Sequence, residues 1–363
     1  MPIYQRISEK LQDERKALTE PAKLPPEDQL ARAHGVTRQT IRRALGLLEN
    51  DGAVTRQRKV GTFLQPERPQ SVALRGGHIG MVAPWWSDSD QSWLTSRVFD
   101  AVSREAHRRG AYASIVHVDR EPTEIGKWIN EMHDRKIIGL VWLHPKGRMQ
   151  QQLIERVSKD LPNVVMTRQF ESDDLHYVLP DYDAAAMIMD KQLAAKGHET
   201  YAVIGGRSLD PHFHFWIDAF ERAHAQRGSM FDWVERYMDI GSFPRSSFGE
   251  LLTNHYLASH PEIEALALTS SSYLLSMVNY RPLLELMKDR LSIITIDIGL
   301  YPIDAYWIGH DISHVACNWR GIAQQAIETI GTLIEGKPAP KHKYVPVTSH
   351  EGQTIYPYRN DLS

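Results

Sequence analysis

Cysteine is almost missing from this chain. Cys317 is the single cysteine among 363 residues, so the chain cannot form an internal disulfide. No apolar run approaches the ~18–20 residues that span a bilayer. The first residues form an amphipathic helical pattern rather than a secretion signal. Together these features predict a protein of the reducing cytoplasm with no membrane partner.

The sequence also lacks the common catalytic and metal-binding motifs. It contains no G-x-S-x-G, no H-E-x-x-H and no phosphate-cradling G-x-x-x-x-G-K-[ST]. His212 and His214 would share one side of a strand or loop, but no third ligand is placed near them. Asp181 and Asp183 open a predicted helix, where carboxylates are favourable without any catalytic role. We therefore expect no enzyme activity, no cofactor and no metal.

The net charge is small, but the charges are unevenly distributed. The whole chain has 42 Lys and Arg against 45 Asp and Glu, a net charge of −3. Residues 1–65 hold 12 basic and 8 acidic residues, whereas the remainder holds 30 and 37. A basic module on an acidic body predicts that residues 1–65 bind the phosphates of a nucleic acid.

Residues 24–64 have the pattern of a winged helix-turn-helix. Pro25 and Pro26 open a short helix. Gly35 can take the left-handed conformation that ends this helix. Thr37 is well placed as the N-cap of a second helix. In such a domain the second helix enters the major groove of DNA.

The second helix has one apolar side and one polar, basic side. The apolar side repeats at helical spacing and consists of Ile41, Ala44, Leu45 and Leu48. Gly52 would end the helix, and segments 54–56 and 61–64 would pair as the wing. Cationic and polar side chains on such a helix and at the wing tip suit phosphates and base edges. The predicted DNA-binding residues are Thr37, Arg38, Gln39, Thr40, Arg42, Arg43, Arg58 and Lys59.

These motifs resemble the DNA-binding domain of the GntR family of bacterial regulators. The resemblance covers residues 3–65 and includes the runs LPPEDQLA, GVTRQTIRRAL and GAVTRQRKVGTFL. It implies that Arg38, Thr40 and Arg42 occupy positions at which the family contacts operator DNA.

Two departures from the family pattern fall within this domain. Asp28 stands where the family usually has Arg, which removes one expected DNA contact. Lys59 stands where the wing usually has Gly, which restores part of the charge. The operator sequence can therefore not be transferred from relatives.

A linker at residues 66–77 precedes an α/β body at residues 78–363. The predicted strands are 79–83, 113–117, 138–143, 164–167, 201–205, 265–269 and 292–297. The predicted helices are 92–109, 122–134, 149–159, 183–196, 214–227, 246–258, 273–288 and 313–335. This alternation predicts two lobes, each with a parallel sheet and helices on both faces. Segments 344–347 and 352–356 are expected to return across the lobes.

The order of motifs in the body resembles the effector-binding domain of the LacI/GalR family, which has the periplasmic-binding-protein fold. The match covers residues 78–356. It includes HIGMVAPWW, RRGAYASIV, IIGLVWL, NVVMTRQ, KGHETYAVIGG, SIITIDIG and GIAQQAIETIGTLIEG, in this order. The resemblance implies a body that forms dimers and binds a small molecule between its lobes. Fusions of a GntR-type DNA-binding domain to an effector-binding domain of this type are known.

Ligands of open α/β sheets bind beyond the carboxyl ends of the strands. The candidates at these predicted ends are Trp85, Asp88, Trp93, Arg168, Trp216, Ser271 and Asp297. Tryptophan stacks on the apolar face of a pyranose, while carboxylates and Arg bind hydroxyl groups. The set predicts a carbohydrate-like effector, with core packing as the alternative for the tryptophans. Trp86 is expected to point away from the cleft.

The resemblance also shows how this pocket departs from its family. Arg168 and Asp297 match positions that bind the ligand or brace the cleft. The ligand-binding Arg of the family pattern R-x-x-G-F falls on Trp216, and the Asp of its N-D pattern falls on Ser271. The pocket is therefore expected to be more aromatic and less charged, which suits a glycoside or an oligosaccharide better than a sugar phosphate.

The sequence as a whole predicts a cytoplasmic, dimeric transcriptional regulator, most simply a repressor. Its partners would be operator DNA and a small carbohydrate-like effector. One alternative is a sugar-binding protein without a DNA-regulated output. Another is an enzyme, since some GntR heads carry an aminotransferase body that needs a Schiff-base lysine. The net positive charge of residues 1–65 disfavours a sugar-binding protein without a DNA-regulated output. The two-lobed pattern of the body disfavours an aminotransferase.

Overall fold

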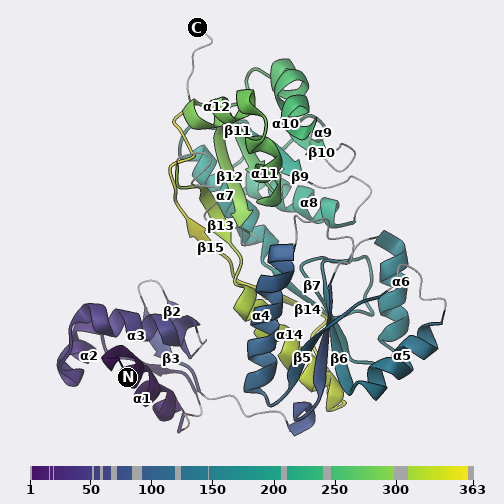
Figure 1. Cartoon of the computed structure of the whole chain (residues 1–363). Helices are drawn as coiled ribbons and strands as arrows, with labels where there is room; N and C mark the ends of the chain where they lie inside the picture. Colours follow the sequence, from purple (N-terminus) through teal and green to yellow (C-terminus); the bar gives the residue numbers. More distant parts are fainter. Residues whose placement is uncertain are drawn as a thin grey trace. The chain divides into compact units, whose positions relative to one another are not determined.

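The computed structural model describes residues 2–15, 17–18, 20–50, 53–57, 60–66, 72–83, 92–118, 124–145, 147–205, 211–239, 247–297 and 310–358. The chain divides into two compact units, residues 1–71 and 72–363, which we call the head and the body (Figure 1). Within the described ranges, no helix combines the length and the apolar composition needed to cross a membrane.

The head is a winged helix-turn-helix. Its helices are α1 (Ile3–Arg15), α2 (Glu27–His34) and α3 (Arg38–Asn50). Its antiparallel sheet has the order β1 (Ala22–Lys23), β3 (Gly61–Leu64) and β2 (Val54–Gln57). Ile7, Leu30, Ile41, Leu45 and Leu64 share one buried core. The two predicted wing strands are confirmed, whereas β1 was not predicted because it is only two residues long.

The ends of the head helices follow the predicted signals. Gly35 has φ 62° and ends α2, and the N–H groups that follow bond back to Ala31 and Arg32. The backbone N–H of Thr40 donates to Oγ1 of Thr37 at 3.2 Å, which is an N-cap bond at the start of α3. Both expectations are confirmed. Gly52, expected to end the second helix, lies outside the described residues.

Lobe 1 of the body is a parallel sheet with the order β14-β8-β7-β6-β4-β5. Its strands are β4 (His78–Val82), β5 (Tyr112–Val116), β6 (Ile137–Leu143), β7 (Asn163–Met166), β8 (Tyr177–Pro180) and β14 (His342–Val345). Its helices are α4 (Ser92–Arg108), α5 (Ile125–Asp134), α6 (Gly147–Val157) and α14 (Trp319–Ile334), and a short 3-10 turn (Val72–Leu74) precedes β4. Helices α4 and α14 pack on one face of the sheet, and α5 and α6 pack on the other.

Lobe 2 is a sheet with the order β10-β9-β11-β12-β13-β15, in which β15 alone runs antiparallel. Its strands are β9 (Ala202–Gly205), β10 (Tyr237–Asp239), β11 (Ala265–Leu268), β12 (Ser292–Asp297), β13 (Ser313–Ala316) and β15 (Thr348–His350). Its helices are α7 (Tyr182–Ala194), α8 (Pro211–Gln226), α9 (Trp233–Arg236), α10 (Phe248–Leu251), α11 (Ser272–Val278) and α12 (Arg281–Asp289). A π-helical segment, Leu252–Leu257, continues α10.

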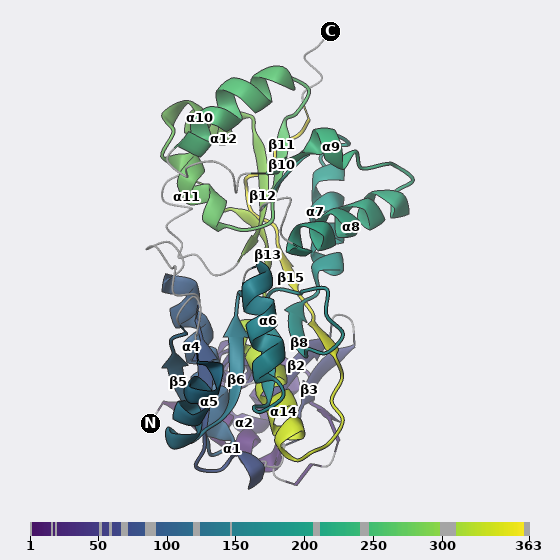
Figure 2. The ribbon, with the colours of Figure 1, turned by 90° about the vertical axis from the view of Figure 1, so that its right-hand side faces the viewer.

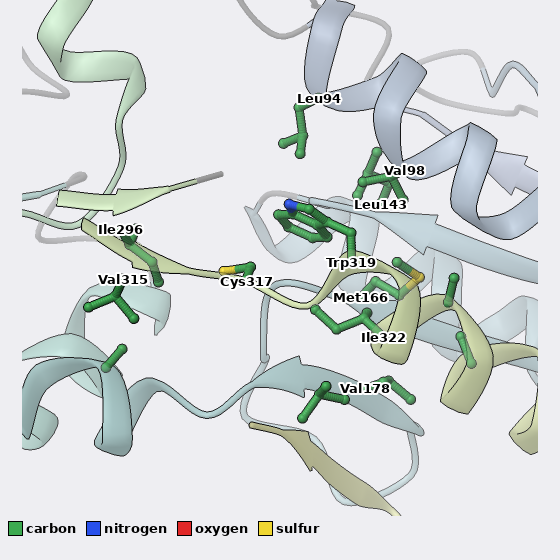
Figure 3. Close-up of a cluster of buried hydrophobic side chains, with 14 of the residues drawn as sticks. Leu94, Val98, Leu143, Met166, Val178, Ile296, Val315, Cys317, Trp319 and Ile322 are labelled. Atoms are coloured by element: carbon green, nitrogen blue, oxygen red, sulfur yellow. The ribbon is translucent and has the colours of Figure 1, made fainter. Parts of the chain in front are cut away.

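The chain crosses between the lobes three times, at residues 180–182, 316–319 and 345–348, as the membership of the flanking strands requires. Figure 2 shows the two sheets as separate lobes with the connecting segments between them. The buried core continues through one crossing. Cys317 lies between Val315 on the side of lobe 2 and Met166 on the side of lobe 1 (Figure 3).

The structure corrects three predictions about the body. The helix expected at 313–335 begins only at Trp319, because residues 313–316 alternate between buried and half-buried positions as strand β13. Asn318 caps the shorter helix by accepting a bond from the N–H of Gly321 at 2.8 Å. The helix expected at 273–288 is two helices that meet at Tyr280. The HFHFW run belongs to α8 rather than to a strand or loop.

Candidate DNA interface and effector site

The first turn of α3 presents Arg38 and Gln39 to solvent. Neither side chain is hydrogen-bonded or ion-paired to any residue that the structure describes. Next to them, the hydroxyl groups of Thr37 and Thr40 lie 2.9 Å apart and bond to one another. Arg38 and Gln39 are therefore unengaged donors at the exposed N-terminal end of the recognition helix, where DNA would be read.

The other two predicted arginines of α3 are held by neighbouring helices. Nη2 of Arg42 donates to Oε2 of Glu27 in α2 at 3.0 Å. The Arg43 guanidinium lies 4.3 Å from the centre of the Tyr4 ring in α1, a cation–π contact. The basic side of α3 thus contains both unengaged and tethered cations, a distinction that helical spacing alone could not reveal.

The turn between α2 and α3 forms an open hollow of about 590 Å³, lined by Asp28, Ala31, Arg32, Gly35, Val36 and Arg38. Asp28 faces Arg32 at 3.9 Å, with both side chains strongly exposed, so this pair contributes little to stability. Asp28 and Arg38 line the same hollow, so Asp28 adds an acidic group to the predicted DNA surface. Arg58 and Lys59 of the wing tip lie outside the described residues.

In lobe 1 of the body, the strand ends carry backbone strain. His144 follows β6 with φ 53°, and Thr167 follows β7 with φ 70°. The two strands are neighbours that pair Leu143 with Met166, and the imidazole Nδ1 of His144 lies 3.1 Å from Oγ1 of Thr167. A left-handed conformation is a genuine outlier for a β-branched residue and costs roughly 1–3 kcal/mol. Such strain is concentrated at functional sites.

His144 was not among the predicted site residues. The signal was nevertheless present, because His144 directly follows a buried strand, just as Arg168 follows the next one. The structure places Arg168 in a partly buried position beside Thr167. The carboxyl ends of β6 and β7 therefore bring an imidazole, a hydroxyl and a guanidinium to one edge of the lobe 1 sheet.

Tyr182 links this edge to lobe 2. Its hydroxyl donates to the carbonyl of Thr167 at 2.5 Å, and its ring lies 4.9 Å from the ring of Trp216 in α8. Burial raises the pKa of Tyr182 well above its ordinary value, so the hydroxyl remains a protonated donor. Trp216 is only 2% exposed and also stacks on Phe220 at 5.9 Å. Trp216 is thus packed in the core, and its contact with an effector stays a prediction.

In lobe 2, Ser271 and Asp297 lie at the carboxyl ends of neighbouring strands. Ser271 is 2% exposed, and its N–H donates to the carbonyl of Ile296 at 3.1 Å. Asp297 is the last residue of β12 and pairs with Ala316 of β13. The side chains of Asp297 and Trp93, and all of Trp85, Trp86 and Asp88, lie outside what the structure describes.

Trp319 is a second residue that the sequence did not indicate, because it lay inside a predicted helix. It is the first residue of α14, directly after the crossing at Cys317 (Figure 3). Its side chain is 5% exposed, yet its indole Nε1 has no hydrogen-bond partner among the described residues. An unsatisfied buried donor costs roughly 1–3 kcal/mol. The crossing between the lobes therefore carries an unused N–H donor.

Within the described residues, no group of three or more His, Cys, Asp or Glu side chains is arranged to hold a metal ion. The side chains at the described strand ends can form hydrogen bonds through hydroxyl, imidazole, indole and guanidinium groups. Such groups bind and orient a polar, uncharged or weakly charged small molecule.

The head matches a known family. Residues 2–64 match the family model described as bacterial regulatory proteins, gntR family. The HTH-type transcriptional regulator GgaR of Escherichia coli (strain K12) is 28% identical over 165 residues. That alignment covers 41% of this chain and 66% of GgaR, so the chain spans somewhat less than two thirds of this curated relative.

Solved structures resemble the fold of the body. The transcriptional regulator CelR in complex with cellobiose is similar with a TM-score of 0.62 and 14% identity, over 91% of this chain and 100% of CelR. The lac repressor dimer bound to operator and an anti-inducer gives a TM-score of 0.60 and 15% identity, over 77% of this chain and 94% of the repressor. The head of this chain therefore matches the GntR family model, and the body has the two-lobed fold of these solved regulators.

Proposed function

We propose that this protein is a transcriptional repressor whose affinity for operator DNA is set by a carbohydrate-like effector bound in the body. The observation that carries the proposal is the exposed, unengaged pair Arg38 and Gln39 on the capped first turn of α3, within a head of net positive charge. Arginine donates two parallel bonds to guanine, and glutamine does the same with adenine. The first turn of α3 therefore has the chemistry of direct base readout.

The repressor acts as a homodimer in this proposal. One recognition helix covers only a few base pairs, and two heads related by a two-fold axis double the contacts. Among the described strands, β5 is one of the two edges of the lobe 1 sheet, and it exposes 57% of Tyr112 and 44% of Ile115. An apolar, open strand edge favours association with another chain. The lac repressor, which shares the body fold, is a dimer on its operator.

The effector is a glycoside or an oligosaccharide in this proposal. Its contacts come from Arg168, Ser271 and Asp297 at the strand ends and from the tryptophans that follow the first strand of lobe 1. Aromatic faces with few charges suit a sugar ring better than a phosphate. CelR, a structural neighbour, is in complex with cellobiose. A protein that binds in this way needs neither a catalytic residue nor a cofactor, and we infer that this one is not an enzyme.

Coupling between effector and operator requires that the effector binds one arrangement of the two lobes better than another. The three crossings of the chain are the segments about which such a rearrangement would occur. The coupling is reciprocal, so operator DNA must change effector affinity by the same factor as the effector changes operator affinity.

The test begins with selection of DNA duplexes by the full-length protein from a random-sequence library. We expect enrichment of a two-fold symmetric sequence whose half-sites are about one or two helical turns apart. Fluorescence anisotropy on that duplex is then measured with cellobiose, other glycosides and sugar phosphates. Failure to enrich any sequence would refute the DNA-binding role. Enrichment without any response to these ligands would refute only the carbohydrate effector.

A further inference from the structure

Glu27 lies at the centre of a chain of ion pairs within the head. It is the first residue of α2, and its side chain is 19% exposed. Its Oε2 accepts a hydrogen bond from Nη2 of Arg42 in α3 at 3.0 Å. Its Oε1 lies 3.6 Å from Nη1 of Arg56 in β2. One carboxylate thus connects the recognition helix with the wing.

Arg56 extends this chain of charges back to the far end of α3. Its Nε lies 3.1 Å from Oε2 of Glu49, near the C-terminus of α3. Arg56 also pairs with Thr62 across the wing hairpin. The four side chains link α3, α2 and β2. A network with shared members holds its geometry better than isolated surface pairs, which contribute little.

We propose that Glu27 is a positioning residue that fixes the direction of the Arg42 guanidinium for reading one base pair of the operator. This inference rests on the proposed function, because it requires α3 to lie in a major groove. Arginine carries five N–H donors in a planar fork. Glu27 engages Nη2, while the Arg42 side chain is still 65% exposed. A guanidinium plane that is already oriented loses less freedom when it donates to a base edge.

Glu27 also limits the affinity of the head for unrelated DNA. Its charge offsets that of Arg42 and Arg56, which would otherwise attract the phosphates of any sequence. Binding without sequence preference follows the number of phosphates that the protein neutralises. Removal of the carboxylate should therefore raise affinity for unrelated DNA and at the same time lower discrimination at the base pair read by Arg42. A purely structural role would not produce these opposite effects.

The experiment compares full-length wild-type protein with Glu27→Gln. The probes are the duplex that the wild-type protein enriches from a random library, its single-base-pair variants, and an unrelated duplex of equal length. The base pair read by Arg42 is the one at which Arg42→Ala loses discrimination. We expect Glu27→Gln to lose roughly two- to fivefold of the discrimination there. On unrelated DNA, the salt dependence should steepen by up to about one unit of log affinity per log salt.

Glu49→Gln is the matched control, because it removes the same charge and one partner of Arg56 but leaves the Arg42–Glu27 pair intact. It should raise affinity for unrelated DNA and keep discrimination at the Arg42 base pair. In an Arg42→Ala background, Glu27→Gln should cause no further loss. Unchanged discrimination in Glu27→Gln, equal loss in Glu49→Gln, or an additive loss in the double variant would each overturn the proposal.

Glu27→Asp separates the effect of side-chain position from the effect of charge. Thermal unfolding of each variant is measured in parallel to detect a folding defect. The shorter side chain keeps the charge but cannot reach Arg42 at the same distance. It should lose discrimination without steepening the salt dependence, and full discrimination in this variant would contradict the positioning role. If the wild-type protein enriches no sequence, the proposed function fails before Glu27 is tested.

Discussion

The head and the body differ in how their candidate functional residues are distributed along the chain. In the head, six of the eight predicted DNA-binding residues fall within residues 37–43, on one helix and its cap. In the body, the corresponding groups follow strands or begin helices that are far apart in the sequence, such as Thr167, Ser271 and Trp319. A helical repeat is enough to recognise the first arrangement, whereas only the sheet topology assembles the second.

The two regions also hold their functional side chains by different means. In the head, exposed arginines are oriented by surface contacts with Glu27 and Tyr4. In the body, the groups are buried or half-buried, and the backbone itself is strained at His144 and Thr167. Substitutions in the head should therefore change binding with little change in stability, while substitutions in the body should change both.

The largest expected effect comes from removing the body. A head of residues 1–65 alone would bind one half-site without a partner, so its operator affinity should fall by roughly 10³-fold or more relative to the full chain. Fluorescence anisotropy on the selected duplex measures this loss. Fusing the head to an unrelated dimeric coiled coil should recover much of the affinity. An isolated head that binds as tightly as the full chain would remove the dimerising role of the body.

Trp216→Ala should destabilise the body by about 3–5 kcal/mol, because it empties the space between Tyr182 and Phe220. Urea unfolding monitored by circular dichroism measures the change. Trp233, which is 43% exposed, provides the matched control, and Trp233→Ala should cost less than about 1 kcal/mol. Equal effects in the two variants would show that Trp216 does not support the body core.

Local patterns predicted most of the architecture but not the contacts that orient the site. The seven strands predicted at 79–297 lie within one or two residues of observed strands, since runs such as 137–143 and 292–297 are apolar and bounded by turns. The short strands β8 and β10 were not predicted. Strand β13 was missed because its short alternation merges with the helix that follows. A strand next to a helix start cannot be separated from that helix by apolar spacing alone.

Side-chain roles were harder to predict than elements. Arg42 and Arg43 were both predicted to contact DNA, but their partners Glu27 and Tyr4 come from other helices, so the tethering is a tertiary property. Trp216 was expected near a strand end, yet it lies on the buried face of α8. The sequence did not point to Trp319, because the lack of a hydrogen-bond partner for its indole N–H, among the residues that the structure describes, is a property of the folded body.

Arg38→Ala should weaken operator binding by roughly 1–3 kcal/mol and relax base preference at one position, because it removes an unengaged donor from the start of α3. Thermal unfolding should be unchanged, since Arg38 makes no hydrogen bond or ion pair with the described residues. Affinity is measured on the selected duplex and its single-base-pair variants. A uniform loss on every sequence would assign Arg38 to a phosphate instead of a base.

Acid should destabilise the body through its buried histidines. Burial lowers the pKa of His198, whose Nε2 lies 2.8 Å from the carbonyl oxygen of Tyr356 and 2.9 Å from Oγ of Ser292. Burial likewise lowers the pKa of His224, beside Asp190. Below the ordinary pKa of about 6.5, the unfolded chain binds protons that the folded body does not, so the free energy of unfolding falls as pH drops below that value.

Thermal unfolding of the body between pH 7.5 and 5.5 would measure this acid sensitivity. The stability due to the neutral histidines is fully present above about pH 6.5 and is lost progressively below it. His198→Asn should lower the melting temperature at neutral pH but reduce its decline toward acid. A decline that is as steep in the variant as in the wild-type protein would show that His198 is not a source of the acid sensitivity.

The smallest expected effects come from relieving the backbone strain at the two ends of β6, where only one of the two strained residues is expected to serve effector binding. Lys136, just before the strand, and His144, just after it, have φ 57° and 53°. Glycine adopts this conformation without a steric cost, so Lys136→Gly and His144→Gly should each raise the free energy of unfolding by up to about 1 kcal/mol.

Lys136 is exposed in a turn, and its replacement should leave effector binding unchanged. His144→Gly also removes the bond to Thr167 and should weaken effector binding, as titration calorimetry with a verified effector would measure. Because strain at a binding site is retained for function, stability and affinity should change in opposite directions at His144 alone. If His144→Gly gained stability and kept full affinity, the strained carboxyl end of β6 would be no part of the effector site.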